Sequence, residues 1–205
     1  MLSIVLPVKD EPFLPQILQQ IETFIQQPHE VLVQTEKGLG YAVSQGIKRS
    51  KGELIVILDG DGSHNPKNIP FMTTYIDKYI NGYDIVVGSR YNGGLTYDSF
   101  SRKVISRIYC KFAQVLFGLN VKDNMSGFFA AKRSVFEKYP IKNKGYKILL
   151  ELLVHSKGDL KTMEYPIVFE QRKLGKSKAD LNQGIETLGF MIKLFMEKYM
   201  WKKPK

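Results

Sequence analysis

Two aspartates one residue apart, Asp59 and Asp61, are the side chains of this sequence best suited to chemistry. They follow a short apolar stretch, Glu53–Leu58, whose Ile and Val content is typical of a strand buried on both faces of a parallel sheet. Open α/β sheets bind ligands beyond the carboxyl ends of such strands. With Gly60 between them, both carboxylates can turn toward one hard cation held against a phosphate. A surface turn is the alternative interpretation of an isolated Asp-Gly-Asp.

The elements before Arg90 favour a parallel sheet. We expect strands at Ser3–Val8, Glu30–Gln34, Glu53–Leu58 and Asp84–Gly88, and helices at Leu14–Gln26, Leu39–Ser50 and Ile69–Ile80. Strand and helix therefore alternate, which is typical of βαβ units with right-handed crossovers. This half of the chain predicts an α/β fold with a mainly parallel central sheet and helices on both faces.

After Arg90 the pattern is less regular. We expect a Gly-rich loop at Asn92–Tyr97, a helix at Ser101–Phe117, a strand at Ser126–Ala131, a helix at Lys147–Ser156 and a strand at Thr162–Phe169. The strand at Ser126–Ala131 is predicted to run antiparallel to its neighbours. The second half is therefore expected to carry substrate specificity.

Length and composition indicate one globular domain. The chain has 205 residues, of which 43% are hydrophobic and 12% aromatic, and this composition excludes a disordered protein. Its single cysteine, Cys110, lies among apolar residues and is expected in the core of a protein kept in a reducing compartment. The chain starts in a strand pattern without a basic leader, so we expect a cytoplasmic protein rather than a secreted one. No apolar run approaches the roughly 20 residues of a membrane span.

The net charge of +10 favours anionic partners. These could be nucleic acid, anionic lipid headgroups or phosphorylated substrates. The sequence has no helix-turn-helix, zinc or RNP pattern, so no nucleic-acid partner is expected. Phosphates of lipids and sugars are the better candidates.

The last helix has two interpretations. Residues Ile185–Trp201 are mostly apolar, and a basic tail of three lysines and a proline follows. The helix could lie in a bilayer interface with its tail on anionic headgroups, or it could dock on the body of the protein or on a second subunit. We therefore separate residues 1–180 from a C-terminal amphipathic helix and basic tail at residues 181–205, and leave the oligomeric state open.

Six short motifs occur in the order and approximate spacing of one enzyme family. They are Ser3-Ile4-Val5-Leu6-Pro7 with Glu11, Lys37-Gly38-Leu39-Gly40-Tyr41-Ala42 with Gly46, Asp59-Gly60-Asp61 with His64 and Pro66, Gly88-Ser89-Arg90-Tyr91, Ser126-Gly127-Phe128-Phe129, and Arg172-Lys173-Leu174-Gly175-Lys176-Ser177-Lys178. They cover nearly the whole chain. They resemble the motifs of family 2 glycosyltransferases of the GT-A fold, most closely those of the dolichol-phosphate mannose synthase branch.

The resemblance implies a hexosyltransferase that inverts the anomeric centre. The donor would be a nucleotide sugar, GDP-mannose first and UDP-glucose as the alternative, and the acceptor a polyprenyl phosphate at the cytoplasmic face of the membrane. Mg²⁺ or Mn²⁺ held by Asp59 and Asp61 would neutralise the charge gathering on the leaving diphosphate. A third metal ligand is expected at Ser63, where relatives often have Gln.

The resemblance also implies the remaining site residues. Catalytic roles are expected for Asp61, Arg90, Arg172 and Lys178, and contacts to the donor nucleotide and its phosphates for Pro7, Glu11, Glu36, Lys37, Asp59, Arg102 and Ser106. An Arg fork suits this task because it binds phosphate oxygens in pairs. The acceptor phosphate is already a nucleophile, so no general base is required. Asp123 and Ser126–Phe129 are placed in the sugar-acceptor region, Gly175 lets its loop bend over bound phosphates, and His64 is interpreted as a residue that orders the Asp turn.

One segment departs from the family pattern. Relatives have an Asp-rich segment after the second strand, then a helix and a third strand, whereas here Val31–Gln34 runs directly into Thr35–Gly38. Glu36 could replace an Asp in part, and the nucleoside pocket is expected to be shortened. Two rival functions stay open: a non-catalytic binder of nucleotide sugars or lipid phosphates, and a nucleotidyltransferase. The latter predicts a Gly-rich basic loop after the first strand, where this chain has Lys9–Pro12.

Overall fold

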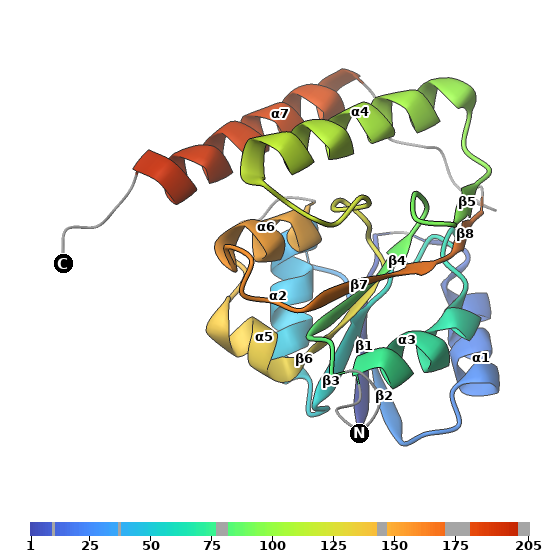
Figure 1. The fold of residues 1–205 in the computed structure, drawn as a ribbon. Coiled ribbons are helices and arrows are strands. Elements are labelled where there is room, and N and C mark those ends of the chain that lie inside the picture. The colour runs from blue at the N-terminus through green and yellow to red at the C-terminus, as the bar shows by residue number, and fades with distance from the viewer. Residues whose placement is uncertain (10, 37, 77–81, 143–146, 171–180, 201–205) are drawn as a thin grey trace.

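A six-stranded sheet of order β2-β1-β3-β6-β4-β7 forms the centre of the computed structural model, which describes all residues except 10, 37, 77–81, 143–146, 171–180 and 201–205 (Figure 1). Its strands are β1 (Leu2–Pro7), β2 (His29–Gln34), β3 (Leu54–Ile57), β4 (Ile85–Ser89), β6 (Phe129–Lys132) and β7 (Thr162–Pro166). β2 and β3 pair in parallel with β1, and β7 in parallel with β4. The predicted mainly parallel sheet is confirmed.

The antiparallel strand predicted in the second half is β6, which lies between β3 and β4. Ala130 is opposite Val56 of β3 and Val86 of β4. All three side chains are fully buried. The strand is apolar on both faces because helices cover the sheet on both sides.

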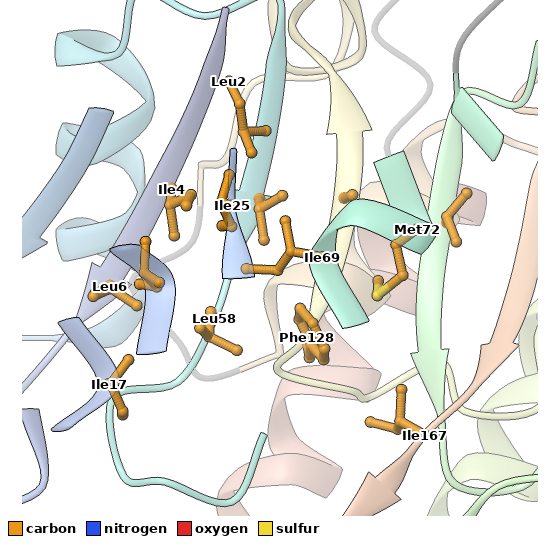
Figure 2. Close-up of a cluster of buried hydrophobic side chains, with 14 of the residues drawn as sticks. Leu2, Ile4, Leu6, Ile17, Ile25, Leu58, Ile69, Met72, Phe128 and Ile167 are labelled. Carbon is orange, nitrogen blue, oxygen red and sulfur yellow. The ribbon is translucent and has the colours of Figure 1, made fainter. Parts of the chain in front are cut away.

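One face of the sheet packs against α1 (Leu14–Phe24), the short helix η1 (Pro66–Asn68) and α3 (Ile69–Ile76). Ile4 and Leu6 of β1 enter this core together with Ile17 of α1 and Met72 of α3, as Figure 2 shows. The residue between them, Val5, lies in the core on the opposite face. This alternation is the two-residue period of a strand covered on both sides.

The other face packs against α2 (Leu39–Arg49), α5 (Arg133–Lys138) and α6 (Ile148–His155). α2 lies very close to β1, because a Cβ atom built on Gly46 would be 2.4 Å from Cγ1 of Val5. Glycine is required there for the helix to approach the strand. α5 was not predicted, since six residues are too few for a helical period to show.

Two further helices, α4 (Phe100–Phe117) and α7 (Leu181–Phe195), lie side by side beyond one edge of the sheet (Figure 1). The second of them, α7, continues as the π-helix η2 (Met196–Met200). Met191 and Leu194 of α7 are buried against Ala113 and Phe117 of α4 in a third core. The last helix therefore docks on the body of the protein by one side. None of the described helices combines the length and the apolar character that crossing a bilayer needs.

The predicted strand Thr162–Phe169 is interrupted at Ile167, and the prediction of one continuous strand was wrong. β7 ends at Pro166, and the chain then forms β8 (Val168–Phe169), which pairs with β5 (Leu95–Thr96) in a small separate sheet. β5 lies inside the predicted Gly-rich loop. A Cβ atom on Gly94 would be 2.1 Å from the carbonyl oxygen of Ser89, so this loop follows the backbone of β4 closely.

Candidate active site

The Asp59–Asp61 turn follows β3 at the carboxyl end of the parallel strands. Leu58 N still donates to Val5 O of β1 at 3.1 Å, and the chain then leaves the sheet. On the far side of the turn, Glu170 N donates to Ser63 O at 3.0 Å. The turn is therefore attached both to the centre of the sheet and to the segment after β8.

The Asp61 carboxylate is buried and oriented by Ser63. Asp61 is 4% exposed. Its Oδ1 accepts a hydrogen bond from Ser63 N at 3.0 Å and a second, very short one from Ser63 Oγ. The Ser63 hydroxyl thus donates to Asp61 and fixes the direction of its carboxylate, and the metal contact predicted for Ser63 stays a prediction.

The Asp59 carboxylate lies directly against the backbone of Gly127. A Cβ atom at residue 127 would be 2.1 Å from Oδ2 of Asp59. On another side, His64 Nδ1 is 3.9 Å from the same oxygen. The His64 ring is itself buried against Phe128 and Phe169, with ring centroids 5.4 and 5.1 Å away. These contacts support the interpretation of His64 as a residue that orders the Asp turn.

The two aspartates fit a cation that a bound diphosphate would help to hold. Among the described residues, no group of three or more His, Cys, Asp or Glu side chains could hold a metal ion by itself. Asp59 and Asp61 supply carboxylate oxygens, and Mg²⁺ in proteins commonly binds one or two carboxylates together with substrate phosphates and water. The donor set is therefore chemically suitable for Mg²⁺ or Mn²⁺.

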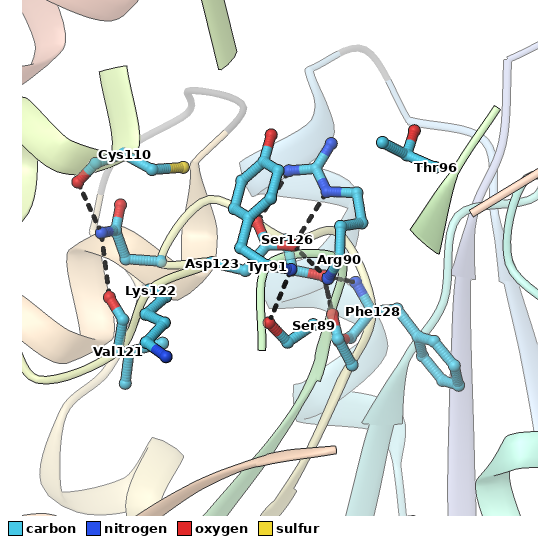
Figure 3. Close-up of polar contacts among 12 residues, drawn as sticks. Ser89, Arg90, Tyr91, Thr96, Cys110, Val121, Lys122, Asp123, Ser126 and Phe128 are labelled. Carbon is cyan, nitrogen blue, oxygen red and sulfur yellow. Dashed lines mark hydrogen bonds and ion pairs between the residues drawn. The ribbon is translucent and has the colours of Figure 1, made fainter. Parts of the chain in front are cut away.

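Arg90 is tied to Asp123 by three hydrogen bonds, drawn in Figure 3. Its backbone N and Nε donate to Oδ2 of Asp123 at 2.8 Å each, and Nη2 donates to Oδ1 at 2.7 Å. Asp123 is completely buried. Burial opposes the charge of Arg90, but the hydrogen bonds and the charge of Asp123 outweigh it and keep the pKa of Arg90 above its usual range. One edge of the guanidinium is therefore already occupied by a carboxylate.

A second carboxylate, Glu164 of β7, holds the Asp123 loop in place. The backbone N atoms of Lys122 and Asp123 each donate to Glu164 at 2.9 Å, and Ser89 Oγ donates to it at 2.7 Å. Ser126 Oγ donates to Gly88 O at 2.8 Å on the other side of the loop. The Gly-Ser-Arg and Ser-Gly-Phe motifs are thus parts of one hydrogen-bonded unit.

Tyr91 joins this unit to α4. Its ring lies beneath the Arg90 guanidinium, with 4.9 Å from Cζ to the ring centroid. Its side chain lies near Ser106 of α4, and burial raises the pKa of Tyr91. Four residues before Ser106 on the same helix, Arg102 has Nη1 3.9 Å from Asp98 Oδ1. The predicted residues Arg90 and Ser106 are thus brought together through Tyr91.

The residues predicted to contact the nucleotide follow neighbouring parallel strands. Pro7 ends β1 opposite Gln34 of β2, Glu11 lies in the loop after β1, and Glu36 follows β2. Glu36 Oε1 is 3.4 Å from Nη1 of Arg49. These side chains share the carboxyl edge of the sheet with Asp59 and Asp61.

Three predicted site residues, Lys37, Arg172 and Lys178, lie outside the described residues, as does Gly175. Their predicted roles stay predictions.

The sequence of residues 4–140 matches the model of Glycosyl transferase family 2. The chain belongs to this family. It is 37% identical over 156 residues to the dolichol-phosphate mannosyltransferase of Pyrococcus furiosus, covering 74% of this chain and 43% of that protein. It is 32% identical over 158 residues to the polyprenol monophosphomannose synthase of Mycolicibacterium smegmatis, covering 72% of this chain and 58% of the relative. The chain thus spans about half the length of these relatives.

Solved structures confirm the family 2 fold at low sequence identity. Glucosyl-3-phosphoglycerate synthase from Mycobacterium tuberculosis, solved with Mn²⁺, UDP-glucose and phosphoglyceric acid, superposes with a TM-score of 0.72 over 97% of this chain and 79% of that one, at 15% identity. A second mycobacterial protein gives 0.74 at 17% identity, over 97% of this chain and 74% of that one. The expected GT-A fold is confirmed.

Sequence reasoning missed one residue of this hydrogen-bonded unit. Glu164 lies in a strand without a recognised motif, and only the structure shows that it anchors the Asp123 loop. Gly127 was part of a recognised motif, but its contact with Asp59 required the three-dimensional fold.

Proposed function

We propose that this chain transfers a hexose from a nucleotide sugar to a polyprenyl phosphate and inverts the anomeric centre. The observation that carries the proposal is the Asp59–Asp61 turn, which lies on a family 2 fold at the sheet edge shared with the nucleotide-contact residues. The names of the relatives from Pyrococcus furiosus and Mycolicibacterium smegmatis support mannose and a polyprenol acceptor. GDP-mannose is the leading donor, and UDP-glucose is the alternative.

Asp59 and Asp61 would hold Mg²⁺ or Mn²⁺ in this reaction. When bound, the cation supplies positive charge to the diphosphate that leaves the sugar. Gly127 and Ser63 set the directions of the two carboxylates. The protein contribution is therefore a pair of carboxylates fixed before the substrate binds.

The acceptor phosphate attacks the anomeric carbon directly, so the configuration inverts. A phosphate dianion needs no general base, and the task of the protein is to bring two anions together. Arg90, together with Arg102 and Ser106 on α4, is proposed to hold the phosphates of donor and acceptor. Arg172 and Lys178 are proposed to complete this set.

We further propose that α4 and α7 bind the cytoplasmic surface of an anionic membrane. Each helix exposes an apolar side, which we call the apolar ridge: Phe100, Val104, Ile105, Ile108, Phe112 and Val115 of α4, and Ile185, Leu188, Ile192, Phe195, Met196 and Tyr199 of α7 and η2. Phe100 is 82% exposed and Val115 74%. α4 carries four basic residues and no acidic one. An apolar surface bordered by basic residues is typical of interfacial binding to anionic lipid.

With the apolar ridge on the membrane surface, the acceptor lipid would lie next to the site. Arg102 and Ser106 belong to the same helix as the apolar ridge but lie on another side of it, near Asp98 and Tyr91. A lipid phosphate at the membrane surface would therefore reach these residues without leaving the headgroup region.

The test of the function is transfer of radiolabelled sugar to a short polyprenyl phosphate. GDP-mannose and UDP-glucose are supplied in separate reactions with Mn²⁺, and product is extracted into the lipid phase. Product from one donor establishes the reaction and names the donor. Absence of product from both, with nucleotide binding intact by calorimetry, would contradict the proposal and favour the non-catalytic binder.

A further inference from the structure

The segment after β7 is attached to two parts of the candidate site. The chain leaves the main sheet at the end of β7, and Phe169 comes to lie in β8. Tyr97 N, just after β5, donates to Phe169 O at 2.9 Å, and Glu170 N donates to Ser63 O at 3.0 Å. The backbone around Phe169 is therefore held both by the loop after β4 and by the Asp59–Asp61 turn.

The Phe169 ring contacts one residue from each of these parts. Its centroid is 5.1 Å from that of the His64 ring, in an edge-to-face arrangement. His64 Nδ1 is in turn 3.9 Å from Oδ2 of Asp59. The Arg90 guanidinium also lies over the Phe169 ring, with 5.3 Å from Cζ to the centroid. One aromatic side chain thus contacts both the histidine beside Asp59 and the arginine that is tied to Asp123.

The Phe169 side chain is not part of the general packing of the fold. It is half-buried and belongs to none of the three hydrophobic cores that the described residues form. Its neighbour Val168 points to the opposite side of the strand and is 40% exposed. Cation–π and edge-to-face contacts depend on the angle between the groups, so the Phe169 ring favours one orientation of Arg90 and one of His64.

We propose that Phe169 is a positioning residue of this site, which keeps Arg90 and His64 in the places that a bound diphosphate requires. The inference rests on the proposed function for the choice of ligand. A diphosphate that is held at one end by a cation on Asp59 and at the other by a guanidinium fits only when these two groups are correctly spaced. Phe169 lies between them and sets this spacing without touching the ligand.

Binding measurements on three variants test this role. Phe169→Leu removes the flat ring but keeps an apolar side chain, Phe169→Tyr keeps the ring, and Val168→Ala shortens an exposed side chain of the same strand. Calorimetry measures the Mn²⁺-dependent binding of GDP and, separately, of UDP. We expect Phe169→Leu to weaken the tighter of the two about 3- to 30-fold, the range of one lost ring contact. Phe169→Tyr should recover most of this loss, and Val168→Ala should bind like wild type.

Double-mutant cycles show whether Phe169 acts through its two neighbours. Arg90→Lys keeps the charge without the planar guanidinium, and His64→Leu replaces the imidazole by an apolar side chain. In each background, once circular dichroism shows a folded chain, Phe169→Leu should weaken nucleotide binding less than it does in the wild-type chain. An equally large loss in both backgrounds would overturn the proposal.

The remaining outcomes separate positioning from packing and from the proposed function. Wild-type affinity in Phe169→Leu, an equal loss in Phe169→Tyr, or failure of the wild-type chain to bind either nucleotide with Mn²⁺ would each overturn the proposal. A lower unfolding temperature of Phe169→Leu with unchanged affinity would show a purely structural role. None of these readouts needs turnover. A chain whose nucleotide binding depends on Phe169 but that transfers no sugar would refute the proposed function and leave this inference standing.

Discussion

At the scale of single residues, the buried ion pair between Arg90 and Asp123 holds part of the candidate site in place. Asp123→Ala would leave the Arg90 guanidinium in a buried position without its partner. We expect a loss of about 3 to 5 kcal/mol in the free energy of unfolding, because an unpaired buried charge is strongly destabilising. Urea denaturation measures the change. Asp159→Ala, which removes a carboxylate from an exposed pair with Lys138, is the control and should leave stability nearly unchanged. Equal free energies of unfolding for the two variants would contradict the burial of the Arg90–Asp123 ion pair.

Gly127 offers a second test at this scale. A methyl group there would overlap Oδ2 of Asp59, so Gly127→Ala must displace that carboxylate. We expect at least about tenfold weaker metal-dependent binding of a nucleoside diphosphate, with a circular dichroism spectrum like that of wild type. Gly189→Ala is the matched control, since a Cβ atom there meets no neighbour within 4 Å. Tight metal-dependent binding by Gly127→Ala would show that Asp59 does not need this backbone contact.

A helix or strand can be predicted from the sequence where the periodic pattern of apolar residues is long enough to be recognised. The predicted strand Ser3–Val8 is β1 (Leu2–Pro7), and the predicted helix Ser101–Phe117 is α4 (Phe100–Phe117). The break between β7 and β8 was missed because Ile167 is apolar like Val168 and Phe169, and these residue types do not show that the chain changes sheets there. Pro166, which cannot donate a ladder hydrogen bond, was the available signal.

Within α4, burial raises the pKa of Cys110 to about 12. The pKa of the thiol in the unfolded chain is near its ordinary value of 9.0, so the unfolded state loses its proton first as pH rises. This contribution to stability is complete below pH 9 and is lost between that value and about pH 12. We expect wild type to lose about 1 kcal/mol more than Cys110→Ala in urea unfolding between pH 8 and pH 10. Equal losses in both proteins would show that the thiol is not buried in this way.

For the whole molecule, membrane binding should depend on both the apolar ridge and the charge. The net charge of +10 predicts binding to vesicles that contain phosphatidylglycerol, and weaker binding to phosphatidylcholine or at high salt. Phe100→Asp with Ile108→Asp should reduce co-sedimentation by at least about tenfold. Phe71→Asp, at an exposed aromatic residue of α3, is the control. Equal binding by both variants would place the membrane surface elsewhere.

At the same scale, the sequence predicted candidate site residues but not how they contact one another. Asp59, Asp61 and Arg90 were predicted because they lie in short motifs that occur in the order and spacing of a known family. Glu164 was not, because a carboxylate in a strand has no distinctive pattern. Its role depends on hydrogen bonds between β7 and the loop that contains Asp123, and those hydrogen bonds exist only in the folded chain.

The central claim is that Asp61 acts in a metal-dependent sugar transfer, and one comparison tests it most directly. Wild type, Asp61→Ala and the control Asp159→Ala are assayed for transfer of labelled sugar to a polyprenyl phosphate, with Mn²⁺ and with chelator. We predict that wild type and the control lose activity only in chelator, while folded Asp61→Ala is inactive in both conditions. Wild-type rates in Asp61→Ala, or wild-type activity that persists in chelator, would contradict the account.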